Sequence, residues 1–229
     1  MTITLCIETS GAHCSLALAQ EAHIYASQHN LERRHNQELL PLLEDLFCQA
    51  QLRPTDVQLV AFGAGPGSFT GVRIAASACQ AIALAADARV LPVRSSWVLA
   101  ATAAKTLPGP KRLVTSLPSR GDAYYLAGAV IEDGALSFLH ADALTDELPD
   151  WVATFLAVPD SHIVGACPGW LPAELQDRFV ADLTPTAQFM VSYARREHEA
   201  GRSLPVEHAL PVYIDGDSPW RKQRPAPNL

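Results

Sequence analysis

The chain lacks the features that mark secreted, membrane and zinc-binding proteins. Its five cysteines are odd in number and scattered through 229 residues, with no Cys-x-x-Cys pair, so neither a disulfide framework nor a zinc ribbon is indicated. The N-terminus has neither the basic segment nor the long apolar run of a signal peptide. The longest apolar candidate for a membrane span, Ile74 to Ala86, is shorter than the ~20 residues that a span needs. We therefore expect a cytoplasmic protein with reduced thiols.

The chain also has fewer positively charged than negatively charged residues. The chain has 17 Lys+Arg against 24 Asp+Glu, a net charge of −7. This balance opposes general attraction to nucleic-acid phosphates and to anionic lipid. We expect no membrane partner, and contact with tRNA only indirectly, through another protein. The small basic, proline-rich stretch Pro219 to Leu229 is interpreted as a solvated terminus.

The first half of the chain alternates between strand and helix patterns. Strands are predicted at 2–8, 14–20, 22–28, 57–62 and 89–93, and helices at 33–51, 70–86 and 96–104. The breaker run "TLPGPK", residues 106–111, is the best candidate boundary between lobes. The first lobe is therefore placed at 1–106 and the second at 107–229.

The second half repeats the same order of elements. Strands are predicted at 111–117, 123–130, 135–140, 162–166 and 180–183, with helices near 146–157 and 172–179. A final helix is predicted to be capped by Thr184, to hold Pro185 in its first turn and to end at Gly201. Two passes of three strands, helix, strand and helix predict a duplicated α/β architecture.

A glycine-rich turn, "GAGPGSFTG", joins the strand at 57–62 to the alanine-rich helix at 70–86. It has no lysine for a Walker loop, and Ser68 stands where a dinucleotide fingerprint needs its third glycine. It is not a nucleophile elbow either, because Pro66 and Thr70 occupy the glycine positions of that motif. Two interpretations stay open: a phosphate-binding turn, or a structural turn whose helix is capped by Ser68 or Thr70. We favour the structural cap.

The two helices at 33–51 and 70–86 together predict a surface for another polypeptide. The first has a wide leucine face, and the second is apolar nearly all round, which indicates burial on more than one side. Ordinary core packing is the alternative, and an arginine such as Arg73 among small residues is more often a buried ion-pair partner. The candidate partner-binding residues are His35, Glu38, Leu39, Leu42, Leu46, Arg73, Ile74, Ser77, Ala78 and Ala81.

Groups for catalysis or metal binding are sparse. None of the eight histidines has another histidine four residues away, so no metal site is predicted. Glu8, at the end of the first strand, is the only carboxylate placed like a phosphate or Mg²⁺ contact, and one carboxylate does not make an acid/base pair. No catalytic residue is predicted. The candidate nucleotide or anion loop consists of Glu8, Gly65, Gly67, Ser68 and Thr70.

Four segments carry a resemblance to a known family. They are "GPGSFTGVRIA" (65–75), "IETS" (7–10), "RRHNQELLPLLEDL" (33–46) and "PVYIDGDSPWRK" (211–222). Together they resemble the TsaB (YeaZ) family of the bacterial tRNA threonylcarbamoyladenosine pathway. The resemblance implies an ASKHA fold (actin, Hsp70, acetate kinase), made of two RNase H-like lobes with mixed sheets flanked by helices.

The family resemblance also implies a role and partners. TsaB proteins look like noncatalytic paralogues of TsaD, whose metal-binding histidines have no counterpart in "VRSSWVLA" (93–100). The resemblance implies a scaffold that binds and stabilises TsaD through the two N-terminal helices, with TsaE joining the complex and a homodimer forming through a similar surface. It implies no cofactor on this chain and leaves room for ATP or ADP at an interface of the complex.

Three positions depart from the family pattern. Glu8 and Pro118 stand where the family usually has aspartate, which weakens the expectation of nucleotide binding, and Ala64 stands where it has arginine. Two other functions stay open at this point. One is a free-standing nucleotide-dependent phosphotransferase that uses Glu8 and the glycine turn. The other is a peptidase, for which no nucleophile, base and metal set is visible.

Overall fold

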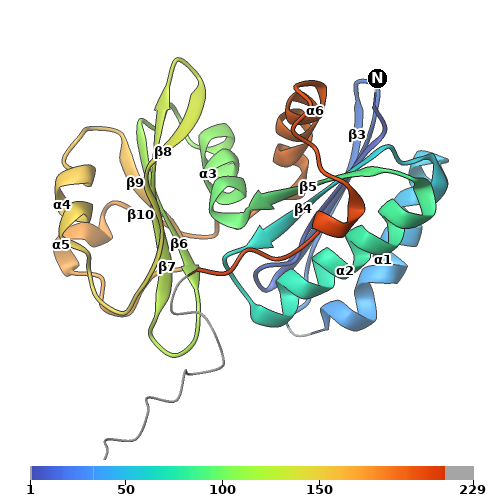
Figure 1. Ribbon diagram of the computed structural model, residues 1–229. Helices are drawn as coiled ribbons and strands as arrows, with labels where there is room; N and C mark the ends of the chain where they lie inside the picture. Colours follow the sequence, from blue (N-terminus) through green and yellow to red (C-terminus); the bar gives the residue numbers. More distant parts are fainter. Residues whose placement is uncertain (1, 33, 215–229) are drawn as a thin grey trace, which may run out of the picture.

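The computed structural model describes residues 2–32 and 34–214, which form two lobes, each built on a five-stranded sheet (Figure 1). The first half of the chain contains β1 (Thr4–Glu8), β2 (His13–Gln20), β3 (His23–Asn30), α1 (His35–Ala50), η1 (Pro54–Asp56), β4 (Leu59–Gly65), α2 (Phe69–Ala86), β5 (Arg89–Arg94) and α3 (Ser95–Thr106). Its sheet has the order β3-β2-β1-β4-β5. Strand β2 pairs antiparallel with β1 and with β3, whereas β4 pairs parallel with β1 and with β5.

The second half repeats this arrangement. It contains β6 (Arg112–Pro118), β7 (Tyr124–Glu132), β8 (Ala135–Thr145), α4 (Asp150–Leu156), β9 (Ser161–Gly165), α5 (Ala173–Gln176), β10 (Phe179–Val180), η2 (Ala187–Met190), α6 (Val191–Glu199) and η3 (Val206–His208). The sheet order is β10-β9-β6-β7-β8, again with an antiparallel meander followed by parallel strands. The predicted duplication of an α/β unit is confirmed.

The first sheet is buried on both faces because its central strands alternate between two cores. Leu5 and Ile7 of β1 face the side covered by α1 and α2, and Cys6 faces the side covered by α6. All five residues of β1 and all seven of β4 are buried. Strands covered on both faces are expected to be continuous apolar runs, as "TLCIE" and "LVAFGAG" largely are.

Helix α3 joins the two lobes. Val98 belongs to the core of the first sheet, and its neighbour Leu99 belongs to the core of the second. A salt bridge also crosses between the lobes, since Arg94 Nη1 lies 2.8 Å from Asp142 Oδ2 on β8. In Figure 1, α3 stands between the two sheets, whereas α4 and α5 cover the outer face of the second one.

The end of the described chain returns to the first lobe, which corrects the predicted extent of the second. Helix α6 packs on β1 and β4, Leu204 pairs with Val90 of β5, and the Val212 N–H donates to the Ala64 carbonyl. Residues 187–212 therefore belong structurally with 2–106, although the sequence predicts a second lobe of 107–229. Breaker residues mark where the chain leaves a lobe, but they do not show whether a later segment returns to it.

The predicted cap of the last helix is wrong. The helix begins as a 3₁₀ turn at Ala187 and becomes α-helical at Val191, with no side-chain cap. The hydroxyl of Thr184 instead accepts a hydrogen bond from Gln28 Nε2 on β3, at 2.9 Å. Tertiary contact with another strand thus outcompetes the local capping role. The predicted end is confirmed, because Gly201 follows the helix with a φ of +72°.

Helix α2 is the one described helix that is long and apolar enough to cross a bilayer, with 18 residues and a mean hydropathy of 1.4. The predicted helix at 70–86 is confirmed, whereas the membrane-span candidate taken from the sequence, Ile74 to Ala86, is shorter than this helix. Its inner side nevertheless packs on the first sheet, with Ala75, Cys79 and Ala83 in the core. Because 33% of the helix is buried, one side of α2 belongs to the core and the other does not. The segment 215–222 of the family resemblance and the basic end of the chain, Pro219 to Leu229, lie outside the described residues.

Two leucines of α1 provide a test of this packing. Leu46 is 1% exposed and Leu40 is 70% exposed. We expect Leu46→Ala to lower the free energy of unfolding by about 3 kcal/mol, because it leaves a cavity in the core. The matched change Leu40→Ala is expected to alter it by less than about 0.5 kcal/mol. Urea unfolding followed by circular dichroism measures both, and equal losses would contradict the assignment of Leu46 to the core.

Candidate functional site

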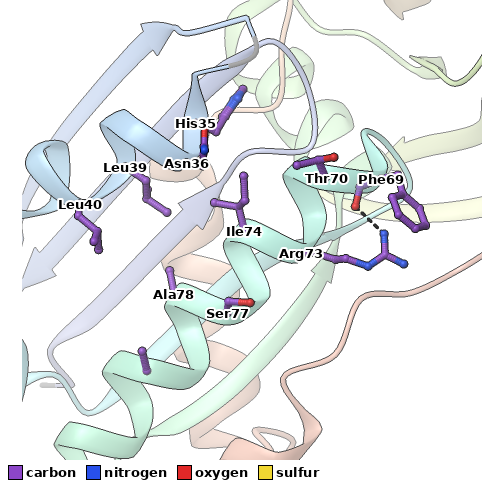
Figure 2. Close-up of a pocket in the computed structure, with 11 residues that line it drawn as sticks. His35, Asn36, Leu39, Leu40, Phe69, Thr70, Arg73, Ile74, Ser77 and Ala78 are labelled. Atoms are coloured by element: carbon purple, nitrogen blue, oxygen red, sulfur yellow. Dashed lines mark hydrogen bonds between the residues drawn. The ribbon is translucent and has the colours of Figure 1, made fainter.

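A groove of about 480 Å³ lies between α1 and α2 on the outer side of the first lobe. Figure 2 shows side chains from both helices around it, with Arg73 extended along the first turn of α2 toward Phe69. The residues that line it are His35, Asn36, Leu39 and Leu40 of α1, and Phe69, Thr70, Arg73, Ile74, Ser77, Ala78 and Ala81 of α2.

The groove exists because small residues occupy the side of α2 that faces α1. Ala78, Ala81 and Ser77 fill little of the space between the helices, whereas the opposite side of α2 is packed on the sheet. The start of α1 is held by His35, a buried side chain whose Nε2 lies 3.3 Å from the carbonyl of His13 on β2. Both helices are thus fixed by the core beneath them, and the hollow between them is open to a partner.

The structure brings most of the predicted partner-binding residues together. His35, Leu39, Arg73, Ile74, Ser77, Ala78 and Ala81 all line the groove. Glu38 lies on α1 outside the lining and pairs with Arg34 at 3.3 Å. Leu42, half-buried, packs against the first core. Contact between these residues and a partner stays a prediction.

The prediction of Leu46 as a partner-binding residue is corrected by the structure. Leu46 is buried in the core of the first lobe, so it does not reach the surface of α1. The leucine stripe of α1 mixes residues that face the sheet with residues that face outward, and periodicity alone does not separate the two groups.

Several exposed apolar residues near the groove were missed by the sequence reasoning. Leu40 is 70%, Leu84 is 74% and Phe69 is 46% exposed. A signal was present, because Leu40 and Leu84 stand immediately after the buried residues Leu39 and Ala83 and thus fall off the core-facing stripes of their helices. A large apolar residue off the buried stripe is a better indicator of an interface than the stripe itself.

Arg73 is not the buried ion-pair partner that its neighbours in the sequence suggest. Its side chain is half-buried, and Nη1 donates to the carbonyl of Phe69 at 2.7 Å. The guanidinium carbon lies 3.2 Å from the centroid of the Phe69 ring and 5.2 Å from that of Tyr213. Among the described residues it forms no salt bridge. The arginine is held by rings and one carbonyl, at the surface.

The glycine turn is tied to the β1–β2 turn. The Ser68 N–H donates to the carbonyl of Ser10 at 2.7 Å, and Ser68 Oγ accepts from the Gly71 N–H at 3.2 Å. Ser68 is therefore the N-cap of α2. A Cβ on Gly71 would lie 2.0 Å from the carbonyl oxygen of Thr9, so the two backbones approach too closely for any other residue.

These contacts favour the structural interpretation of the glycine turn. Gly65 has a φ of +102°, which favours glycine over a residue with a side chain. A phosphate at the start of a helix is held by free backbone N–H groups, whereas here those of Ser68 and Gly71 already have acceptors within the chain. Thr70, also assigned to the candidate anion loop, is exposed and lines the groove.

Glu8 is the one carboxyl group in the core of this region. It is 2% exposed and accepts hydrogen bonds from the Ser10 N–H at 2.6 Å and from Ser95 Oγ at 3.0 Å. A Cβ on Gly63 would lie 2.0 Å from Glu8 Oε2, so glycine is required opposite this side chain. Burial raises the pKa of Glu8 above its ordinary value of 4.5, and the hydrogen bonds from Ser10 and Ser95 offset part of this rise.

A cavity of about 270 Å³ between the lobes is lined by Glu8, His13, Ser116, Pro118 and Asp182, among others. Pro118, where the family resemblance places an aspartate, contributes no carboxylate. Ser116 Oγ is buried and has no hydrogen-bond partner among the described residues. Within residues 2–32 and 34–214, no three His, Cys, Asp or Glu side chains are grouped to hold a metal ion.

The sequence of this chain is similar to a protein-family model and to proteins of known name. The family model described as TsaD, tRNA N6-adenosine threonylcarbamoyltransferase, matches residues 9–134. The tRNA threonylcarbamoyladenosine biosynthesis protein TsaB of Escherichia coli K12 is 30% identical over 228 residues, which cover 95% of this chain and 96% of the relative. TsaB of Haemophilus influenzae is 26% identical and covers 95% of each chain.

Two solved structures from Pseudomonas aeruginosa share the fold. One is described as YeaZ and superimposes with a TM-score of 0.79. The other, described as an uncharacterized protein with similarity to peptidase YeaZ, superimposes with a TM-score of 0.82. Both are 31% identical to this chain and cover 93% of it and 100% of the solved chain. Together with the duplicated sheets, these matches identify the ASKHA-type fold.

The buried carboxyl of Glu8 gives a prediction about pH. A folded-state pKa above the ordinary 4.5 means that the folded protein keeps a proton that the unfolded chain has released. Its contribution to stability is therefore full below pH 4.5 and is lost as pH rises through the folded-state pKa. The Glu8→Gln variant lacks this titration and keeps an acceptor for Ser10. We expect its free energy of unfolding to gain on the wild type from acidic to neutral pH.

Chemical unfolding at a series of pH values measures this difference. Glu44→Gln, an exposed change on α1, is the matched control and is expected to show no such trend. A Glu8→Gln difference that stays constant with pH would contradict a buried, protonated carboxyl.

Proposed function

Because the chain belongs to the TsaB (YeaZ) family, we propose that it is a noncatalytic subunit in the formation of threonylcarbamoyladenosine on tRNA, beside the anticodon. It acts by binding and stabilising TsaD, the catalytic subunit, through the groove between α1 and α2. The observation that carries the proposal is the groove itself, an apolar hollow between two helices with large exposed apolar side chains at its edge.

The surface chemistry around the groove favours a protein partner. Leu40 and Phe69 are exposed and line the groove, Leu84 is exposed farther along α2, and exposed apolar patches on a folded protein usually mark an interaction site. Fully burying a leucine or phenylalanine side chain contributes about 1.5–3 kcal/mol. A helical partner that inserts side chains over Ala78 and Ala81 would bury these residues together, in the way that an amphipathic helix fills an apolar groove.

The region between the lobes supports a role without catalysis on this chain. Burial raises the pKa of Glu8, and its two carboxyl oxygens already accept hydrogen bonds from Ser10 and Ser95, which leaves them less available to Mg²⁺. Pro118 brings no carboxylate to the cavity, and Asp182, the other carboxylate in its lining, does not complete a group of three metal ligands among the described residues. The proposal therefore assigns no cofactor to this chain, and places any ATP or ADP at an interface of the complex that TsaE also joins.

The proposal also covers the contact with tRNA, the compartment and the oligomeric state of the chain. The net charge of −7 opposes direct attraction to tRNA, so contact with tRNA is indirect and runs through the catalytic subunit. The protein works in the cytoplasm, and a homodimer through the same groove competes with the complex when TsaD is absent.

Binding to TsaD is tested by changes in the groove. Leu40→Asp places a charge at the exposed edge, and Ala78→Trp fills the hollow. We expect each to weaken binding at least about 10-fold, because a charge must be desolvated or the partner helix is displaced. Leu139→Asp, at a leucine 62% exposed on β8 of the second lobe, is the matched control. Isothermal titration with TsaD of the same organism measures all three, and wild-type affinity for both groove variants would refute the groove as the binding site.

Reconstitution tests the function itself. Purified TsaD and TsaE, with the remaining enzymes and substrates of the pathway, are assayed for threonylcarbamoyladenosine on tRNA with and without this chain. We expect formation only in its presence, strongly reduced yield with Leu40→Asp, and normal yield with Leu139→Asp. Full modification without the chain would refute the proposed requirement.

A further inference from the structure

Arg73 offers hydrogen-bond donors at the edge of the groove that the described residues do not use. A guanidinium carries five N–H donors, and of these one, on Nη1, donates to the Phe69 carbonyl. In residues 2–32 and 34–214, no carboxylate lies within salt-bridge distance of Arg73, whereas Arg34, Arg53, Arg94 and Arg202 each have one. Within the described part of the chain, the charge of this arginine on an apolar groove is therefore not paired with a carboxylate.

The groove lining around Arg73 offers this arginine no acidic partner. None of the residues that line the groove is an aspartate or glutamate. The first turn of α2, which lies beside Arg73, contains no acidic residue to offset the positive end of the helix dipole. Glu38 of α1 is already paired with Arg34, and Glu32, which lines a neighbouring hollow with Phe69, forms no salt bridge with Arg73. Among the described residues, no carboxylate therefore pairs with Arg73.

The guanidinium is also held in place before any partner arrives. Its carbon lies 3.2 Å from the ring centroid of Phe69 and 5.2 Å from that of Tyr213, and the hydrogen bond to the Phe69 carbonyl fixes its direction. A planar, restrained guanidinium loses less conformational entropy per hydrogen bond formed than a free side chain does. Arginine in such positions is common among residues that dominate binding.

We infer that Arg73 is a specificity-determining residue of the groove, which pairs with a carboxylate on a helix of the partner protein. This inference rests on the proposed function and adds the chemistry of the partner: an amphipathic helix with apolar residues over Ala78 and Ala81 and an aspartate or glutamate at the end near Phe69. A second copy of this chain presents the same lining, which contains Arg73 and no carboxylate. The groove therefore prefers an acidic heterologous helix to itself.

The experiment compares three variants of the full chain for binding to TsaD of the same organism, at low and at high salt. Arg73→Gln removes the charge and Arg73→Lys keeps it without the planar fork. Arg178→Gln is the matched control, because Arg178 is also half-buried and without a salt bridge among the described residues, and lies in the second lobe. Titration calorimetry gives the affinities, and sedimentation of the chain alone gives its self-association.

We expect Arg73→Gln to weaken binding about 10-fold at low salt, as expected for loss of a charge-assisted hydrogen bond, and to flatten the dependence of affinity on salt. Arg73→Lys is expected to keep the salt dependence with a smaller loss. Self-association is expected to be unchanged or strengthened by Arg73→Gln.

Two results would overturn the inference while leaving the proposed function intact. One is Arg73→Gln binding TsaD with the affinity and salt dependence of Arg178→Gln. The other is a loss of self-association as large as the loss of TsaD binding, which would make a second copy the occupant that Arg73 recognises. A wild-type chain that does not bind TsaD would instead refute the proposed function, and this inference with it.

Discussion

The close approach of the β1–β2 turn to the start of α2 is the constraint on which the rest of the structure depends. Gly63 leaves room for the carboxyl of Glu8, and Gly71 lets the backbone of Thr9 pass within contact distance of the helix. Hydrogen bonds from Ser68 to Ser10 and from Thr9 to Gly71 close this junction. Because α2 is fixed at its first turn, its outer face, its distance from α1 and the groove between them are fixed as well.

The same junction separates the inner side of the glycine turn, beside Glu8, from the outer surface of α2. On the inner side, the N–H groups of Ser68 and Gly71 are taken up by Ser10 and Ser68, and the carboxyl of Glu8 is buried with a raised pKa. On the outer side, Phe69 begins α2 with an exposed ring beneath which Arg73 is held. The polar groups of the turn thus serve to anchor a helix, and the chemistry offered to other molecules lies on the helix surface.

Much of the fold and part of the site could be predicted from the sequence. Strand and helix patterns depend on neighbouring residues, so the order of elements and the Ser68 cap follow from local rules, as does the positive φ of Gly65. The return of residues 187–212 to the first lobe depends on distant contacts, such as Val212 with Ala64, and no local pattern records them. Thr184 shows the same limit, because Gln28 of a remote strand takes the hydroxyl that the sequence assigns to a cap.

The sequence by itself determined that two helices near the N-terminus carry more apolar surface than one sheet contact needs, and that groups for metal binding or acid/base chemistry are sparse. The tertiary structure alone decided which of those apolar residues are outside. Leu46 faces the core and Leu40 faces solvent because the sheet beneath α1 sets the rotation of the helix, a quantity that the spacing of leucines leaves open. It also decided that Arg73 has no salt-bridge partner among residues 2–32 and 34–214, since the position of every distant charge depends on how the elements pack.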